Sequence, residues 1–201
     1  MTDRRTFLAS GIAVLGAGLA GCAGGGGTLS GGWITLIDAS TNSLDGWTQI
    51  GQGNWSFVDG ALQGKDGKAG YLVTKDSYAD FEIRAEFWAD ENANSGIFIR
   101  CKDRNKVGAD SSYEVNVWDK RPDQRYATGG IVDFGAVAQP APKAANRWNT
   151  YEISARGNRI VAVLNGQQTA EVIDGTHRSG PFALQSAAGT IRFRKVQVRA
   201  M

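Results

Sequence analysis

The chain has 201 residues and carries 22 Lys and Arg against 20 Asp and Glu, so its formal net charge is +2. A charge so near zero argues against a nucleic-acid-binding protein, because binding phosphates requires a basic face that displaces counterions. Two cysteines and one histidine supply too few nitrogen and sulfur ligands for a typical zinc site and allow at most one disulfide. The length suits one domain with a sizeable core.

Residues 1–21 have the pattern of an export signal. Arg4 and Arg5 precede an uncharged, largely apolar run over residues 7–20. This run is the length of a signal-peptide apolar region and is shorter than the roughly 20 residues that a membrane-spanning helix needs. The sequence Arg4-Arg5-Thr6-Phe7-Leu8 is similar to the twin-arginine export signal, which a receptor reads as an address.

The export signal ends at a cysteine. Leu19-Ala20-Gly21-Cys22 resembles the bacterial lipobox, in which the cysteine is acylated and becomes the mature N-terminus. Several acyl chains on one residue give stable anchoring. We therefore expect an exported protein, attached through Cys22 to a bacterial membrane and facing the periplasm or the cell exterior. Residues 22–32 are glycine-rich and predict a flexible tether.

Residues 33–201 are predicted to form one all-β domain. Apolar and polar residues alternate over residues 81–88, 97–102 and 113–118, which is typical of strands with one buried face. Asp59-Gly60 and Asn165-Gly166 are strong hairpin signals. Further strands are expected at residues 33–38, 54–58, 71–74, 150–155, 159–164, 168–173, 181–186 and 191–199. This spacing favours a two-sheet antiparallel jelly-roll sandwich. Two longer irregular stretches, residues 103–112 and 120–147, are expected to carry function.

The polar faces of the three alternating strands form a candidate sugar-binding patch. If the strands are neighbours, their outward side chains mix carboxylates, an arginine, an amide and large aromatics. Sugar C–H faces stack on aromatic rings, while hydroxyl groups need donors and acceptors. Two other interpretations are a solvated sheet face with cross-strand charge pairs and a surface that docks a protein partner. The patch includes Glu82, Arg84, Glu86, Trp88, Phe98, Arg100, Glu114, Asn116 and Trp118.

Other residue patterns leave further chemistry open. Glu114-x-Asn116-x-x-Asp119 is similar to the Glu-x-Asp-x-x-Glu strand motif of laminarinase-like glycosidases, with Asn at the middle position. Without a Gly-x-Ser-x-Gly elbow, His177 is read as a surface-loop residue. No cofactor is expected. The acidic loops at residues 90–94 and 103–110 could hold a structural Ca²⁺.

Motifs along the whole predicted domain resemble those of the 3-keto-disaccharide hydrolase domain family, which has a concanavalin A-like jelly-roll fold. The family often carries Gln where this chain has Asn116, and His shortly after the Leu-Gln pair, where this chain has Ser186-Ala187-Ala188. The motifs that carry the resemblance are Leu44-Asp-Gly-Trp47, Phe81-Glu-Ile-Arg-Ala-Glu-Phe87, Asn94-Ser-Gly-Ile-Phe-Ile-Arg100, Tyr113-Glu-Val-Asn116, Thr128-Gly-Gly-Ile131, Trp148-Asn-Thr-Tyr151, Gly180-Pro-Phe-Ala-Leu-Gln185 and Ile191-Arg-Phe-Arg-Lys-Val-Gln-Val198.

The resemblance implies cleavage of 3-keto-glycosides. A ketone at C3 acidifies the C2 proton, so the reaction needs a general base and a group that stabilises the developing oxyanion. We assign Glu114 as the base, Arg100 as the oxyanion stabiliser or sugar clamp, and Asp133 as an aid to proton transfer. The alternative is a non-catalytic carbohydrate-binding lipoprotein. The expected substrate-binding residues are Asn116 and Gln185 for hydroxyl groups, Trp118, Trp88 and Phe98 for stacking, and Asp119 beside them.

Overall fold

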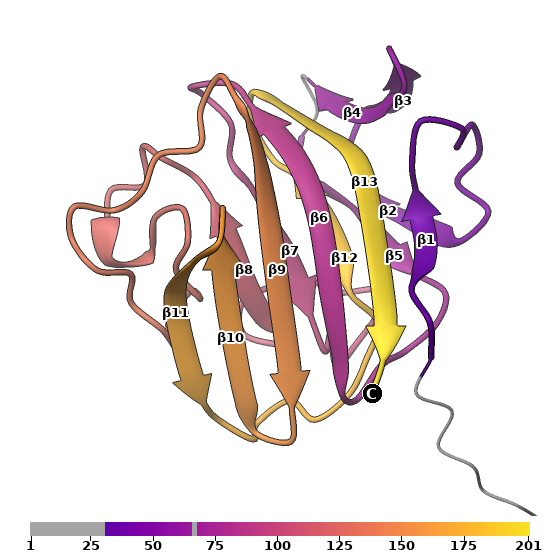
Figure 1. Cartoon of the computed structure of the whole chain (residues 1–201). Coiled ribbons are helices and arrows are strands. Elements are labelled where there is room, and N and C mark those ends of the chain that lie inside the picture. Colours follow the sequence, from indigo (N-terminus) through magenta and orange to yellow (C-terminus); the bar gives the residue numbers. More distant parts are fainter. Residues whose placement is uncertain (1–30, 66–67) are drawn as a thin grey trace, which may run out of the picture.

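The computed structural model describes residues 31–65 and 68–201, which form two antiparallel sheets (Figure 1). The predicted export signal and Cys22 lie outside the described residues. The eight-stranded sheet contains β1 (Ile34–Ile37), β3 (Trp55–Val58), β4 (Ala61–Lys65), β6 (Phe81–Ala89), β9 (Trp148–Arg156), β10 (Arg159–Leu164), β11 (Gln167–Ile173) and β13 (Thr190–Ala200). The five-stranded sheet contains β2 (Trp47–Gly51), β5 (Gly70–Thr74), β7 (Ser95–Ile99), β8 (Tyr113–Val117) and β12 (Ala183–Ser186).

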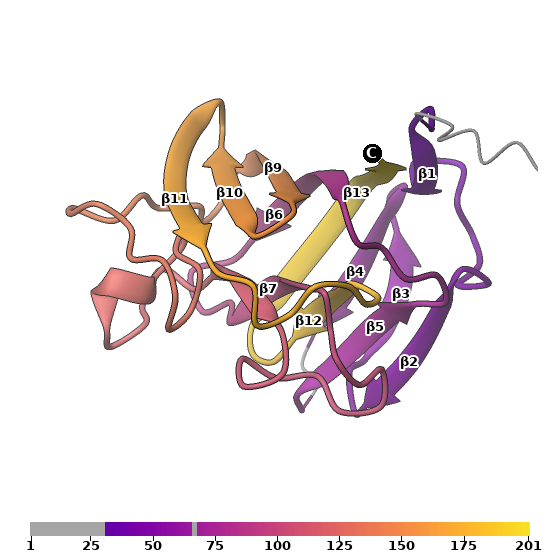
Figure 2. The same cartoon turned by 90° about the horizontal axis from the view of Figure 1, so that it is seen from below.

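The order of strands within each sheet differs from their order along the chain. The larger sheet runs β11-β10-β9-β6-β13-β4-β3, with β1 also paired to β13, and the smaller runs β2-β5-β12-β7-β8. Figure 2 shows the two sheets as layers, with β6, β9, β10 and β13 in one and β2, β5, β7 and β12 in the other. The predicted two-sheet sandwich is therefore confirmed.

The alternating strands bury their apolar faces between the two sheets. In β6 every second residue from Phe81 to Ala89 is buried, and the residues between them are half-buried. Leu72, Ile97 and Val115 supply the facing side of this core from the five-stranded sheet. The period of two in the sequence thus corresponds to one core between the sheets.

The two hairpin dipeptides form tight turns as predicted. Asp59-Gly60 joins β3 to β4 with φ values of 49° and 70°, and Asn165-Gly166 joins β10 to β11 with 51° and 81°. The strand β2 was not predicted, although Trp, Thr and Ile favour strands, because its five residues are too few for a clear alternation. The strand β4 was implied only as the second strand of the Asp59-Gly60 hairpin. Pairing with β5 and with β3 and β13 fixes them.

A long irregular segment, residues 118–147, follows β8 and folds back along it. It contains one turn of 3-10 helix, η1 (Gln124–Tyr126). The Tyr151 hydroxyl lies between strand and segment: it donates to the Asn116 carbonyl at 2.6 Å and accepts from the Gly129 amide at 2.8 Å. Because both bonds are buried, the segment has a fixed position at the edge of the five-stranded sheet. No helix in residues 31–65 and 68–201 is long and apolar enough to cross a membrane.

Candidate functional site

The outer face of the five-stranded sheet gathers polar side chains from neighbouring strands. Glu114 of β8 pairs with Phe98 of β7, and Gln185 of β12 pairs with Tyr71 of β5. The Glu114 side chain leans over Gly96 of β7: a Cβ added at Gly96 would lie 3.1 Å from the Glu114 Cγ and Oε1 atoms. The carboxylate therefore lies over β7, the strand between β8 and β12.

Glu114 is a buried residue whose side chain carries a carboxylate. The residue is 8% exposed, and no hydrogen bond or ion pair to its carboxylate occurs within the described part of the chain. Burial raises the pKa of Glu114 to about 7, the positive charge of Arg121 acts against that rise, and the carboxylate of Asp133 adds to it. A carboxylate with a pKa near neutrality is suited to accept a proton as a general base.

Three polar atoms around Glu114 also have no protein partner. They are the Oδ1 atom of Asn116, the Oε1 atom of Gln185 and the Nε atom of Arg121. The other ends of the two amides are held, since Asn116 Nδ2 donates to the Tyr126 carbonyl at 2.6 Å and Gln185 Nε2 to the Tyr71 hydroxyl at 3.3 Å. Buried polar atoms are nearly always hydrogen-bonded, so two fixed acceptors and a donor without partners indicate a site for a hydroxyl-bearing ligand.

Trp118 and Arg121 form the border of the site next to β8. The Arg121 amide donates to the Trp118 carbonyl at 3.3 Å, and the Arg121 guanidinium carbon lies 5.6 Å from the centre of the Trp118 ring. Asp133, from the same segment, is exposed and has a φ of 64°. The predicted residues Glu114, Asn116, Gln185, Trp118 and Asp133 are thus brought to one side of the molecule.

Sequence reasoning missed Arg121, Tyr71 and Gly96. Arg121 lies in an irregular segment, where no periodicity assigns a face to a side chain. Tyr71 lies in a strand that the sequence did predict, and extending the alternation argument to that strand would have placed it beside Gln185. Gly96 belongs to the site because the Glu114 side chain lies over it, and the sequence alone does not show that orientation.

Trp88 does not belong to this site, contrary to the sequence prediction. It lies on β6 in the eight-stranded sheet, where it pairs with Trp148 of β9 and Arg192 of β13. Alternation correctly gave the outward residues of β6, but β6 is not a neighbour of β7 or β8. The predicted single patch is therefore two surfaces on opposite sheets, and Glu82, Arg84 and Glu86 belong to the other one.

Arg100 cannot serve as the predicted oxyanion stabiliser, because its side chain is fully buried and fully used. Its φ of 53° takes it out of the β7 alternation. The guanidinium donates to the carbonyls of Ala79, Gly157 and His177 and to the Asp80 carboxylate. These five bonds account for all five of its N–H donors. Arg100 therefore joins loops at one end of the sandwich, and its role is structural.

Two further residues have other roles than the predicted ones. The Asp119 carboxylate accepts from the Thr128 hydroxyl at 2.6 Å and from the amides of Ala144 and Ala145 at 3.0–3.1 Å, so it fastens the segment and does not bind substrate. Phe98 is 1% exposed and stands edge-on to Tyr71, with ring centres 5.3 Å apart. It forms an apolar floor beneath the site and offers no open stacking surface.

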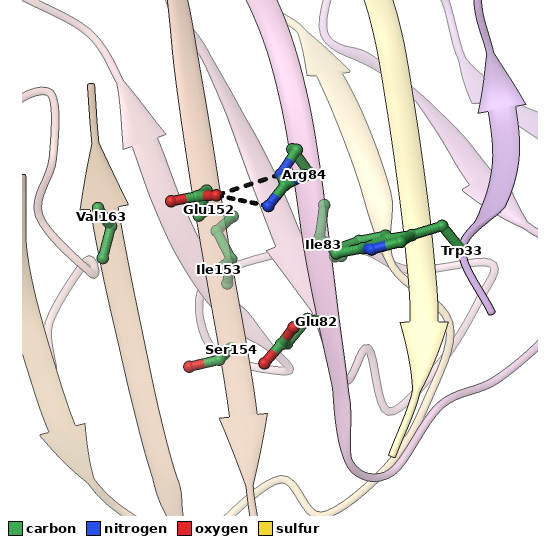
Figure 3. A pocket seen from close by; sticks show the side chains of 8 residues that line it. All are labelled: Trp33, Glu82, Ile83, Arg84, Glu152, Ile153, Ser154 and Val163. Atoms are coloured by element: carbon green, nitrogen blue, oxygen red, sulfur yellow. Dashed lines mark hydrogen bonds and ion pairs between the residues drawn. The ribbon is translucent and has the colours of Figure 1, made fainter. Parts of the chain in front are cut away.

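Two hollows lie elsewhere on the surface. Figure 3 shows one of about 200 Å³ on the eight-stranded sheet, where Arg84 donates to Glu152 and the Trp33 ring lies alongside. Its remaining carboxylate, Glu82, is paired with Arg156 and Arg199. Another hollow, of about 480 Å³, surrounds the saturated Arg100 and contains His177, whose pKa is lowered by burial. Glu114 is preferred as the candidate base because its carboxylate is buried and its pKa is raised to about 7.

Metal ligands do not gather in the part of the chain that the structure describes. Within residues 31–65 and 68–201, no group of three or more His, Cys, Asp or Glu side chains could hold an ion. In the acidic loop at residues 90–94, the Asp90 carboxylate accepts from the amides of Asn92 and Thr190 at 2.8 and 2.7 Å. A Ca²⁺ ion at either acidic loop, residues 90–94 or 103–110, stays a prediction.

A family model matches residues 32–199 of this chain, and its description is a 3-keto-alpha-glucoside-1,2-lyase-like domain. The chain belongs to this family. The match runs across both sheets and includes every residue of the Glu114 site. The resemblance read from the motifs is thus confirmed, and it places the chain in a carbohydrate-active, hydrolase-like family.

One curated relative and two solved structures similar to this 3-keto-alpha-glucoside-1,2-lyase-like domain share 19–23% sequence identity with it. A Bacteroides thetaiotaomicron 3-keto-disaccharide hydrolase is 23% identical over 170 residues, which is 70% of this chain and 58% of that protein. A Parabacteroides distasonis protein provisionally assigned as a glycosyl hydrolase superposes with a TM-score of 0.69 at 23% identity, over 85% of this chain and all of that one. The Bacillus subtilis carbohydrate-binding module CBM66 gives 0.61 at 19% identity, over 80% and 99%. These structures share the fold.

Adding one methyl group at Gly96 tests whether the lean of Glu114 matters in this lyase-like domain. In Gly96→Ala the new Cβ would meet the Glu114 Cγ and Oε1 atoms at 3.1 Å and the Val115 carbonyl oxygen at 3.2 Å, so the carboxylate must move. If Glu114 is the general base, we expect about a tenfold loss of kcat/KM on a 3-keto-glycoside, because the reaction depends on the position of that carboxylate and a displacement of about 1 Å can cost a hundredfold. Gly46→Ala is the control, since its Cβ would meet only the Leu36 Cδ2 atom, at 4.0 Å. Equal activity of both variants would contradict the prediction.

Proposed function

We propose that this domain cleaves 3-keto-glycosides, with Glu114 as the general base. The observation that carries the proposal is a single unpaired carboxylate, buried on a sheet face and with its pKa raised to about 7. Glycosidases that use two carboxylates need both near the scissile bond. Here the second predicted acid, Asp119, is bound by backbone amides and Thr128. A reaction that needs one base fits these residues better.

The ketone supplies the acidity that such a base requires. In the proposed step, Glu114 removes the proton from C2 of the sugar, the C2–H electrons form the C1–C2 double bond, and the C1–O bond to the leaving group breaks. Water adds to the double bond afterwards, so the net reaction is hydrolysis. Negative charge develops on the C3 oxygen during proton removal, and a positioned cation lowers the energy of that state.

Arg121 takes the role that the sequence assigned to Arg100. It lies near enough to Glu114 to affect the pKa of that carboxyl, and its Nε–H has no partner. The Asn116 and Gln185 oxygens are placed to accept from sugar hydroxyl groups, and the Trp118 ring offers an apolar face at the border. Asp133 is proposed to assist proton transfer through its electrostatic contact with Glu114.

The comparisons support the substrate class without specifying it. The name of the Bacteroides relative states a 3-keto-disaccharide substrate, and the family description names a 3-keto-glucoside. This chain spans 58% of that relative's length, so any activity that depends on the rest of the relative need not be shared. Because CBM66 has a similar fold, non-catalytic carbohydrate binding is the alternative outcome of the experiment described next.

The deciding experiment compares an oxidised sugar with its parent. The domain is incubated with 3-keto-trehalose or 3-keto-lactose and, in parallel, with the unoxidised disaccharide, and free monosaccharide is measured. We expect product from the keto sugar only, because the parent lacks an acidified C2 proton. Saturable binding of the keto sugar without product release would replace this proposal with the carbohydrate-binding alternative.

We also propose that the protein is exported and attached to a bacterial membrane through Cys22. The proposal rests on the twin-arginine and lipobox patterns in the sequence. Cys22→Ser in the full chain should move the protein from the membrane fraction to the soluble exported fraction, because the acylated side chain would be missing. A variant that stays in the membrane fraction would show that Cys22 is not the anchor.

A further inference from the structure

Tyr71 reaches the site from the strand on the far side of Gln185. Tyr71 of β5 pairs directly with Gln185 of β12, and its ring stands edge-on to Phe98. Its hydroxyl accepts a hydrogen bond from Gln185 Nε2 at 3.3 Å. The residue is half-buried, so its ring is fixed by neighbours while its polar end faces the same side as Glu114.

The hydroxyl proton of Tyr71 is available to a ligand. Gln185 Nε2 donates to the Tyr71 oxygen, and within residues 31–65 and 68–201 the Tyr71 O–H itself donates to no protein group. Burial raises the pKa of Tyr71, and the nearby Glu114 carboxylate raises it further. The phenol therefore keeps its proton at neutral pH and can act as a donor, whereas Glu114 titrates near neutrality and can act as an acceptor.

The two groups approach Gln185 from opposite sides. Glu114 leans from β8 across Gly96 of β7 toward β12, and Tyr71 reaches β12 from β5. Adjacent strands lie about 4.8 Å apart, so a bound sugar over Gln185 would have the carboxylate on one side and the phenol on the other. An elimination needs this pairing, because the proton leaves C2 while the departing oxygen is on the adjacent C1.

We propose that Tyr71 is the general acid that protonates the leaving glycosidic oxygen as Glu114 removes the C2 proton. The C2–H and C1–O bonds break, the C1–C2 double bond forms, and the Tyr71 proton becomes the hydroxyl proton of the released alcohol. The proton held by Glu114 then returns to the Tyr71 phenolate through water, which restores both groups. This inference rests on the proposed function, since it assigns a second reacting group in the same step.

The test varies the leaving group, because a general acid matters only where the leaving oxygen is strongly basic. Wild type and Tyr71→Phe are compared on 3-keto-lactose, which releases a sugar alkoxide, and on a 4-nitrophenyl 3-keto-glucoside, which releases a weakly basic phenolate. We expect Tyr71→Phe to lower kcat on 3-keto-lactose by about a hundredfold or more and on the nitrophenyl substrate by less than tenfold. KM for 3-keto-lactose should change little.

A control variant and a measurement of folding accompany the comparison of the two substrates. Tyr78→Phe is the control, since Tyr78 is buried between Phe81 and Phe182 in the core, and thermal unfolding confirms that both variants fold. Equal losses on the two substrates, or no loss on either, would overturn the role of Tyr71 while wild-type cleavage preserves the proposed function. A wild-type protein that cleaves neither substrate would instead remove the proposed function, and the role of Tyr71 with it.

Discussion

Glu114→Gln should abolish cleavage and at the same time stabilise the protein at alkaline pH. The amide fills the same space over Gly96 but cannot accept the C2 proton, so we expect kcat/KM for a 3-keto-glycoside to fall at least a thousandfold. In the wild type, kcat/KM should rise with pH through about 7, because only the ionised carboxylate is a base. Arg121 lowers the pKa of Glu114, so a variant without that charge should move this rise to higher pH.

The stability effect follows from linkage. The pKa of Glu114 is about 7 in the folded state against 4.5 for an ordinary Glu, so the folded protein binds the proton more tightly than the unfolded chain does. The associated stability is fully present below pH 4.5 and is lost as pH rises through 7, up to about 3 kcal/mol at pH 8. Glu114→Gln should therefore match wild type near pH 4 and exceed it at pH 8.

Urea unfolding at the two pH values measures this difference. Glu171→Gln is the control, because Glu171 is a surface carboxylate whose hydrogen bond from Arg159 lowers its pKa. Glu171→Gln should therefore not raise the free energy of unfolding at pH 8 relative to wild type. An unchanged free energy of unfolding for Glu114→Gln at pH 8 would mean that the buried carboxylate costs the fold little, and would weaken its assignment as the base.

Arg100→Met should destabilise the fold strongly and leave the turnover of folded protein nearly unchanged. Removing the fully buried guanidinium breaks its bonds to the carbonyls of Ala79, Gly157 and His177, of which the bond to His177 is buried and the others are part-buried. Breaking a buried charged network of this kind costs about 3–5 kcal/mol. For a domain of this size that corresponds to a fall in Tm of roughly 10 °C.

Arg121→Met should lower turnover and leave the stability of the fold nearly unchanged, which is the reverse of the result expected for Arg100→Met. The Arg121 guanidinium borders the site and its Nε has no partner, so its loss should lower kcat about a hundredfold with little change in Tm. Thermal unfolding and kcat at low temperature, measured on both variants, separate the two arginines. If folded Arg100→Met, or Arg100→Lys where the first variant does not fold, loses as much turnover as Arg121→Met, then Arg100 has the catalytic role that the sequence assigned.

The sequence predicted the faces of strands but not which strands are neighbours. Alternation placed Glu114 and Asn116 on one face of β8 and Trp88 on an outward face of β6, and each of these placements is right. The grouping of Trp88 with Glu114 was wrong because pairing partners lie far apart in sequence: β7 pairs with β8 and β12, and β6 with β9 and β13. Local periodicity carries no information about this choice.

Single backbone angles and irregular segments limited the rest of the site prediction. Arg100 has the right spacing after Phe98, but its φ is positive and its buried side chain donates to loop carbonyls at one end of the sandwich. Asp119 is two residues beyond the strand, and its carboxylate is used entirely by the Thr128 hydroxyl and by two amides of the segment that follows. Arg121 enters the site from that same segment, where residue type alone does not indicate direction.

Trp33, near the start of the described domain, lies on the face of the sandwich opposite Glu114. Its ring is held between the guanidinium groups of Arg84 and Arg199, at 4.9 and 4.8 Å, on the outer face of the eight-stranded sheet. Glu114 lies on the outer face of the other sheet, so the two faces point in opposite directions. If the chain is attached through Cys22 as proposed, its attachment enters the domain on the side away from Glu114, so that the anchor itself does not cover the Glu114 face.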